Sequence, residues 1–341
     1  KLKLLRLNLY VNVAWGCLLT AVLVRSLVSG QPCPPTCVAN VRPLFDDTCQ
    51  CAYVNINCKL VNITDPISFL NTSAIGTHLL YLEIRRCDLP TGLPPAALAP
   101  FPSLEKIIVL YSHMETWDGP LPPSVMSLMI RFSHLRTIPR ALHVNVPPQL
   151  VALVLEACFI PSIPDSVIRA WSTVERLYLL NISLQALPSS LATTLPLVDV
   201  DFRQNNLTTL PRAWLASQTQ PSIFRDLVAA KFAGNPLGDD AMPWGLVTSH
   251  VTTDLSGTLA WTMPSNVVVP WNGWGKKTVV LDGTPYCLGN QSSSTPALCA
   301  PICAPGCFGY MRGDYLCNLE CFNIACGFDG GDCDDFGFDS R

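Results

Sequence analysis

The chain has little charge for its length. Of its 341 residues only 14% are Asp, Glu, Lys or Arg, the net charge is −3, and no basic block occurs. Nucleic-acid-binding domains show a clustered basic surface, so this balance argues against that class of partner. The mean hydropathy is positive, which is unusually apolar for a free domain.

Sequence motifs of common enzymes are absent. There is no Gly-x-Ser-x-Gly, no His-Glu-x-x-His and no P-loop. Among the five histidines, His113 and His134 hold equivalent places in the repeats described below, but no carboxylate cluster or third ligand joins them. Catalysis needs a nucleophile, a base or an open metal site within mutual reach. We therefore expect that the protein is not an enzyme.

What the chain does have is a repeat of aliphatic residues between Leu79 and Leu237. The template L-x-x-L-x-L-x-x-N/C-x-L occurs seven times, with starts at residues 79, 104, 125, 150, 174, 197 and 227. This pattern and spacing resemble leucine-rich repeats. The resemblance implies an α/β solenoid with a curved parallel sheet, in which stacking buries the leucines and caps close both ends.

The ninth template position predicts how each turn is held. A small polar side chain there bonds to the neighbouring turn inside the solenoid. Cys87 and Cys158 hold this place, so we expect both to be buried and free. Ile182 holds it in the fifth repeat, which predicts a local irregularity.

Cysteines cluster on both sides of the repeats. Cys33, Cys37, Cys49, Cys51 and Cys58 resemble the cysteine-rich N-terminal flank of extracellular leucine-rich repeat proteins. Five is odd, so one is left over or pairs elsewhere. After the repeats, a tryptophan-rich segment (239–299) reads as a C-terminal cap and spacer, in which Cys287 and Cys299 are expected to pair.

The C-terminal segment (300–341) holds six cysteines and the sequence Asp329-Gly330-Gly331-Asp332. A segment this short cannot fold on burial alone, so we expect disulfides, whose pairing the sequence alone leaves open. The glycines allow a tight turn that brings Asp329 and Asp332 together. Carboxylates held close favour a hard cation, and Ca²⁺ accepts such flexible oxygen coordination. The alternative is that these aspartates only solvate an exposed loop.

These cysteine intervals and the Asp-Gly-Gly-Asp sequence resemble the Lin12-Notch repeat (LNR). The resemblance implies the disulfides Cys303–Cys326, Cys307–Cys321 and Cys317–Cys333. It also implies a structural Ca²⁺ held by Asp314, Asp329 and Asp332, with the Met311 carbonyl as a further ligand. Met311 departs from the family pattern, in which a side-chain oxygen often holds that place.

The compartment is predicted from cysteines, sequons and the N-terminus. Sixteen cysteines favour an oxidising environment. Five glycosylation sequons agree with it, at Asn62, Asn71, Asn181, Asn206 and Asn290. Residues 1–30 form a predicted apolar helix, which is either a signal peptide cleaved near Gly30 or a membrane anchor. Since the chain begins with Lys, we expect further residues upstream, and this favours the anchor. The alternative to both is a helix buried in a protein core. Residues 31–78 are then the N-terminal cap and 79–238 the repeats.

A partner is expected on the concave face of the repeats. The positions that flank the strand leucines carry apolar, aromatic and arginine side chains, the composition of protein-binding hot spots: Arg85, Ile108, Leu110, Tyr111, Met129, Arg131, Phe132 and Tyr178. Single exposed apolar residues are also ordinary. Glycans at Asn181 and Asn206 would obstruct the C-terminal half, so we expect a ligand to engage repeats one to four.

The sequence therefore predicts an extracellular or cell-surface recognition protein that binds a protein or glycan. One alternative is the regulatory ectodomain of a larger membrane receptor, in which the LNR shields or positions a neighbouring segment. Another is a secreted inhibitor of a foreign enzyme. The combination of leucine-rich repeats with a terminal LNR is similar to surface proteins of oomycetes.

Overall fold

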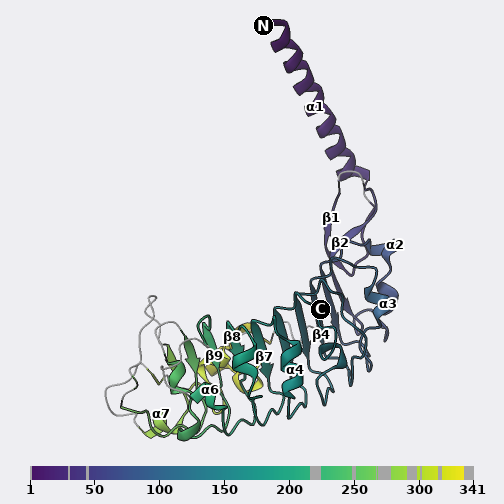
Figure 1. The fold of residues 1–341 in the computed structure, drawn as a ribbon. Coiled ribbons are helices and arrows are strands. Elements are labelled where there is room, and N and C mark those ends of the chain that lie inside the picture. The colour runs from purple at the N-terminus through teal and green to yellow at the C-terminus, as the bar shows by residue number, and fades with distance from the viewer. Residues whose placement is uncertain are drawn as a thin grey trace. The chain divides into compact units, whose positions relative to one another are not determined.

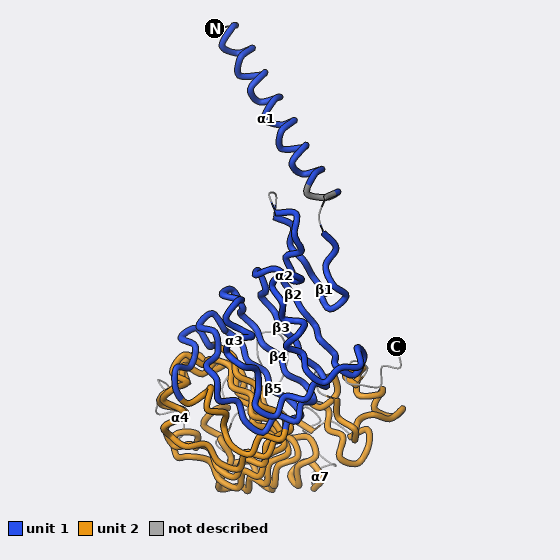
Figure 2. The backbone as a smooth tube through the Cα atoms, turned by 90° about the vertical axis from the view of Figure 1, so that its right-hand side faces the viewer, with its two compact units in different colours: residues 1–133, 144–150 blue, residues 134–143, 151–341 orange. Residues whose placement is uncertain are grey.

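The protein is described from a computed structural model. The described residues are 2–29, 31–43, 46–215, 224–247, 251–265, 267, 278–289, 298–299, 302–313 and 317–333. They fall into two compact units, residues 1–133 with 144–150 and residues 134–143 with 151–341 (Figure 2). The N-terminal helix and cap belong to the first unit, and the LNR belongs to the second.

Helix α1 (Leu2–Ser29) opens the first unit. Its stretch Lys3–Arg25 is 23 residues long with a mean hydropathy of 1.8, which is long and apolar enough to cross a membrane. None of that stretch is buried, so the alternative of a buried core helix is wrong. Near its C-terminal end, Arg25 Nη2 lies 2.9 Å from Asp47 Oδ2 of the cap.

The N-terminal cap is an antiparallel pair, β1 (Cys37–Val41) and β2 (Gln50–Asn57), crossed by the disulfides Cys33–Cys49 and Cys37–Cys51. A third disulfide, Cys58–Cys87, joins the cap to the first repeat. The prediction that Cys87 is free is therefore wrong, because Cys87 is the partner of the odd cap cysteine. Cys158 is free and buried, as predicted.

Three repeat strands follow in the first unit, β3 (Tyr81–Arg85), β4 (Lys106–Leu110) and β5 (Ser127–Arg131). Each pairs in parallel with the strand before it, in register, starting from β2. The aliphatic residues at the fourth and sixth template positions are at most 1% exposed. Short helices lie between the strands: η1 (Ile67–Phe69), α2 (Thr72–Ile75) and α3 (Pro95–Leu98).

The second unit continues the same design, with its strands side by side in Figure 1. Its first strands are β6 (Ala152–Glu156), β7 (Arg176–Leu180), β8 (Asp199–Asp201) and β9 (Ala229–Lys231), and β6 to β9 pair in parallel. Helix η2 (Arg140–Leu142) precedes β6, and α4 (Asp165–Ala170), α5 (Leu191–Thr194) and α6 (Arg212–Leu215) connect the four strands. Pro139, Pro164 and Pro211 each precede a helix directly, where the missing N–H breaks no helical hydrogen bond.

The ladder extends beyond the predicted end of the repeats at 238. Strands β10 (Thr252–Asp254) and β11 (Val279–Val280) add two parallel strands, with Ala230, Thr253 and Val279 in register. Part of the segment predicted as cap and spacer thus consists of an eighth and a ninth repeat. Thr253 replaces a template leucine, which hides the eighth repeat from pattern matching. Helices η3 (Asp239–Ala241), η4 (Trp244–Leu246) and α7 (Pro285–Gly289) lie in the same segment, closed by the disulfide Cys287–Cys299.

The ninth template position is occupied by a buried residue in every repeat, and its asparagines bind backbone groups of two turns. The Asn205 Nδ2 donates to the Leu179 carbonyl (2.6 Å) and to the Phe202 carbonyl (3.0 Å). Its Oδ1 accepts from the backbone N–H groups of Ile182 and Leu184, both at 3.0 Å. Asn205 therefore supplies the hydrogen bonds for the turn of the fifth repeat, because the ninth-position residue of that repeat, Ile182, has no polar side-chain group. The predicted irregularity in the fifth repeat is present, since Ser183 adopts φ 60°.

The LNR folds around its disulfides. Its described residues form four short 3₁₀ turns, η5 (Gly309–Met311), η6 (Leu319–Cys321), η7 (Ile324–Cys326) and η8 (Phe328–Gly331). The cysteines are paired Cys303–Cys326, Cys307–Cys321 and Cys317–Cys333, the connectivity that the family resemblance implies. Its small core consists of Cys307, Met311, Cys321 and Cys326, each at most 3% exposed.

Replacing Asn205 by Ala removes the partners of two buried N–H groups and at least one carbonyl. At about 1–3 kcal/mol for each unsatisfied buried group, we expect a loss of about 3 kcal/mol or more in the free energy of unfolding. Chemical denaturation measures it. Gln185→Ala, at an exposed site in the same unit, is the control. Equal denaturation midpoints for the two variants would contradict this account of the ninth position.

Candidate functional site

The residue at the eighth template position, which follows the strand directly or within three residues, adopts a left-handed backbone conformation in all nine repeats. These residues have φ between 48° and 70°: Arg86, Tyr111, Phe132, Ala157, Asn181, Gln204, Gly234, Gly257 and Gly283. The chain leaves the strand there, so the side chain stands at the edge of the sheet. For residues other than glycine this conformation costs about 1 kcal/mol.

In the first unit the eighth-position side chains form a stacked row, Arg86–Tyr111–Phe132. The rings of Tyr111 and Phe132 are parallel, with centroids 4.5 Å apart and an interplanar angle of 6°. The Arg86 guanidinium lies 5.8 Å from the centroid of the Tyr111 ring. Side chains from three consecutive repeats therefore make one continuous planar stack, whose two ring residues are half-buried.

The strand residues beside this row are partly accessible. Ile108 and Met129, at the fifth position of β4 and β5, are half-buried, as are Arg85 and Arg131 at the seventh position. Leu110 is only 6% exposed, so the prediction that it faces a partner is wrong. In the sheet register Leu110 lies between Arg85 of β3 and Arg131 of β5.

The polar groups of this face in the first unit are mostly basic. Glu83 is 4% exposed, accepts a hydrogen bond from the Tyr53 hydroxyl and pairs with Arg85. Burial, followed by the hydrogen bond to Glu83, raises the pKa of Tyr53 to about 12. Lys106, Arg86 and Arg131 place further basic groups on the first unit.

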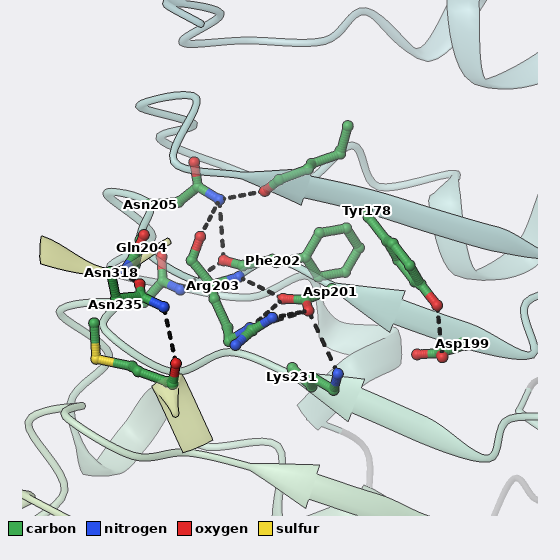
Figure 3. Close-up of polar contacts among 12 residues, drawn as sticks. Tyr178, Asp199, Asp201, Phe202, Arg203, Gln204, Asn205, Lys231, Asn235 and Asn318 are labelled. Carbon is green, nitrogen blue, oxygen red and sulfur yellow. Dashed lines mark hydrogen bonds and ion pairs between the residues drawn. The ribbon is translucent and has the colours of Figure 1, made fainter. Parts of the chain in front are cut away.

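Tyr178, the last predicted contact residue, belongs to the second unit. Its hydroxyl donates to Asp199 Oδ2 at 2.8 Å (Figure 3). Burial and this bond raise the pKa of Tyr178. The structure thus brings the other predicted contact residues together in the first unit and gives Tyr178 a polar partner in the second.

A buried ionic cluster lies on the strands next to Tyr178. Arg203 binds Asp201 through two nitrogens, Nε to Oδ1 at 2.8 Å and Nη2 to Oδ2 at 2.7 Å, and Lys231 Nζ lies 3.6 Å from Asp201 Oδ2 (Figure 3). Arg203 and Asp201 are at most 5% exposed. Asp201 and Arg203 hold the fifth and seventh template positions, which flank the strand leucines, yet both are buried. Their opposite charges compensate each other within the sheet.

The LNR brings oxygen-bearing groups together at the Asp-Gly-Gly-Asp turn. Asp329 is fully buried and accepts a hydrogen bond from the Asn318 N–H on Oδ2 at 2.5 Å. Asp329, Gly330 and Gly331 have φ of 61°, 66° and 94°, which folds the turn back on itself. A Cβ on Gly330 would lie 2.9 Å from the Gly313 nitrogen, so this turn lies directly against the segment after Met311.

These residues fit a hard cation in the part that is described. A buried carboxylate, a second carboxylate at Asp332 and the adjacent Met311 backbone offer oxygen ligands of the kind that Ca²⁺ prefers. The Met311 carbonyl also accepts from Asn318 Nδ2 at 2.9 Å. Asp314 lies outside the described residues. The clustered sulfurs near Asp329 belong to the disulfide Cys317–Cys333 and are not thiolate ligands.

The LNR contacts the last repeats through the glycines of the eighth position. A Cβ on Gly283 would lie 1.9 Å from Phe308 Cε1, and one on Gly257 would lie 3.0 Å from Phe308 Cε2. The Phe308 ring therefore occupies the space that side chains fill in earlier repeats. Gln204 Nε2 also donates to Asn318 Oδ1 at 3.4 Å (Figure 3). This contact had no signal in the repeat pattern.

Other predicted sites are placed as follows. Asn62, Asn71, Asn181 and Asn206 are exposed, whereas Asn290 lies outside the described residues. The Asn71 Oδ1 caps helix α2 by accepting from the Ser73 N–H at 3.0 Å. His113 Nδ1 lies 3.4 Å from Asp88 Oδ1, a single carboxylate, and both side chains are more than half exposed.

Comparison with known proteins identifies one module by sequence. Residues 298–334 match the Notch family model, described as an LNR domain. No curated protein matches the chain. An LNR beside leucine-rich repeats, with seven disulfides in the described residues, indicates an extracellular or secreted protein with a protein-binding role.

Solved structures with similar folds are leucine-rich repeat proteins. A TLR13–ssRNA complex aligns at TM-score 0.45 and 17% identity, covering 60% of this chain and 29% of that one. A leucine-rich repeat protein of Leptospira interrogans aligns at TM-score 0.46 and 15% identity (65% and 58% covered). Human 5T4, trophoblast glycoprotein, aligns at 0.44 and 17% (55% and 72%). The chain spans less than two thirds of the first two, and these alignments carry no conclusion about function. The resemblance to oomycete surface proteins stays a prediction.

The carboxyl group of Asp254 on β10 gives the second unit a pH dependence. Burial raises its pKa to about 6 from 3.8, while hydrogen bonds from Ser256 oppose the shift. The folded chain therefore keeps a proton that the unfolded chain loses, and stability should fall as the pH rises from 4 through 6. Two pKa units correspond to about 3 kcal/mol.

Asp254→Asn keeps an oxygen acceptor for Ser256 but cannot ionise. We expect this variant to be more stable than wild type at pH 7.5 and equally stable at pH 4, measured by denaturant midpoints. Asp240→Asn, at an exposed carboxylate, should keep the wild-type dependence of stability on pH. If Asp254→Asn also kept that dependence, the loss of stability between pH 4 and pH 6 would not come from Asp254.

Proposed function

We propose that the protein is an extracellular recognition protein that binds another protein through the open face of its first repeats. The Arg86–Tyr111–Phe132 row carries this proposal, because it combines two aromatic rings and a guanidinium in one half-buried stack. Aromatic residues and arginine dominate the energetic centres of protein interfaces. Ile108 and Met129 add apolar surface beside the row.

The stack favours a protein partner over a glycan. Sugars bind aromatic residues by lying on a free ring face, whereas the Tyr111 ring already stacks on Phe132 and lies beneath the Arg86 guanidinium. Arg86 and Lys106 add basic groups to the half-buried rings, and this combination suits an apolar segment that carries an acidic side chain.

The choice of residue at this position favours a role for the two rings. The left-handed conformation belongs to every repeat, and Tyr111 and Phe132 adopt it with φ of 53° and 52°, where glycine would be free of strain. Three later repeats use glycine at the same position, so the fold itself does not require a bulky aromatic residue there.

The same proposal includes a membrane anchor and a calcium-binding LNR. Helix α1 is exposed and long enough to span a bilayer, which suits a signal anchor, although a cleaved signal peptide passes the same test. The ligands of Ca²⁺ would be Asp314, Asp329 and Asp332 with the Met311 carbonyl. Glycans at the exposed Asn181 and Asn206 would restrict a partner to the earlier repeats.

A regulatory ectodomain is the second candidate. The contact between Phe308 and the last repeats favours it, since an LNR packed on its own chain is placed to shield a surface. In that case the LNR regulates the surface around the eighth-position glycines: it covers this surface while it is docked, and its release exposes the surface.

Screening against arrayed extracellular proteins and arrayed glycans tests the binding face. We expect at least one protein ligand, bound at least about tenfold more weakly by Tyr111→Ser and by Phe132→Ser, because loss of a hot-spot residue costs 2 kcal/mol or more. Val228→Ser, which alters an exposed apolar residue of the second unit, is the matched control. Glycan ligands whose affinity is unchanged in both serine variants would refute the proposal.

Chelation tests the calcium site. Because metal binding and local folding are coupled, we expect EGTA to speed amide exchange within residues 303–333 by about tenfold or more while strands β3 to β9 stay protected. Asp329→Asn should show the fast exchange even with calcium present. Exchange that is the same with calcium and with chelator would show that the site holds no calcium.

A further inference from the structure

Asn318 connects the proposed calcium ligands to the repeats. Its N–H donates to Asp329 Oδ2 at 2.5 Å, and its Nδ2 donates to the Met311 carbonyl at 2.9 Å. Its Oδ1 accepts from Gln204 Nε2 at 3.4 Å, at the eighth position of the sixth repeat (Figure 3). Asn318 is 7% exposed. One buried residue therefore touches two ligand groups and the solenoid, the Asp329 carboxylate through its backbone and the other two through its side chain.

Phe308 forms a second connection. Its ring packs on Gly257 and Gly283, and the adjacent turn η5 returns the chain to Met311, whose N–H donates to the Phe308 carbonyl at 3.0 Å. The Met311 side chain is buried in the LNR core. A shift of the Met311 backbone therefore moves Phe308, and the reverse also holds.

The repeats have a matching surface. Gly234, Gly257 and Gly283 hold the position where Arg86, Tyr111 and Phe132 stand in the first unit. Glycine leaves the space that the Phe308 ring fills, and no other residue type would do so at Gly283, where a Cβ would lie 1.9 Å from the ring. Gly309 of the LNR also lies close to Asp282 of the ninth repeat.

We propose that calcium binding to the LNR and docking of the LNR on the last repeats are coupled, with Asn318 as the positioning residue. The coupling rests on the proposed calcium site. Without a cation, the carboxylates of the Asp-Gly-Gly-Asp turn repel one another, and opening of the turn withdraws the groups that hold Asn318 and Met311. The Gln204 and Phe308 contacts then weaken.

Linkage makes the coupling reciprocal. If calcium strengthens docking by a given factor, docking strengthens calcium binding by the same factor. A substitution in the repeats, far from any ligand in the sequence, must then lower the calcium affinity. If the calcium site were independent of the repeats, such a substitution would leave the calcium affinity unchanged.

Calcium titration of the full chain by isothermal calorimetry tests this. Gly283→Ala should weaken calcium binding about five- to tenfold, within the usual range of coupling between sites. Gly238→Ala, in the same unit, is the control, because Gly238 has an ordinary extended backbone and no atom lies within 4 Å of the place that its Cβ would take. We expect it to bind within about twofold of wild type, as substitutions without a clash usually do.

Gln204→Ala provides an independent variant should Gly283→Ala fail to fold, and it should weaken calcium binding about two- to fivefold, the worth of one hydrogen bond. In wild type, chelation should also speed amide exchange at Gly257, whose N–H donates to the Asp282 carbonyl at 2.7 Å. Wild-type calcium affinity in Gly283→Ala and Gln204→Ala would overturn the coupling and leave the calcium site standing. Absence of calcium binding in wild type would instead overturn the site itself.

Discussion

The left-handed residue at the eighth position of each repeat is the constraint on which the surfaces of this protein depend. A parallel strand that must turn sharply and pass behind its neighbour puts one residue at φ between 48° and 70° in every repeat. The backbone is the same at each site, so only the side chain differs. The identity of one residue per repeat therefore determines what the edge of the sheet can bind.

Two uses of that position follow from two residue types. In the first unit, Arg86, Tyr111 and Phe132 fill it and stack into a row that is proposed to meet a protein partner. In the second unit, Gly257 and Gly283 leave it empty, and Phe308 of the LNR packs there. The chain thus shows on itself that an aromatic ring binds at this edge, which supports the same chemistry for an external partner.

The repeats could be found from the sequence because they depend on local spacing, and the LNR connectivity was implied by the family resemblance that the cysteine intervals carry. Sequence reasoning missed features that depend on contacts between distant residues. Cys58–Cys87 pairs a cap cysteine with a template position, and the template alone assigned Cys87 to a buried free thiol. The eighth and ninth repeats escaped detection because Thr258 and Thr284 replace the ninth-position asparagine, each bonding to a backbone carbonyl of its own turn at 2.7 Å. Leu110 was placed on the surface because the template ignores neighbouring strands.

The most direct test of this account is whether the Phe308 ring lies on Gly283 in solution. Selective labelling of phenylalanine and glycine allows the α-protons of Gly283 to be observed by NMR. The account predicts a strong ring-current shift of these protons and nuclear Overhauser effects to the Phe308 ring, both lost in Phe308→Ala. Unshifted α-protons without such effects would contradict it, because the eighth-position glycines would then have no role in holding the LNR.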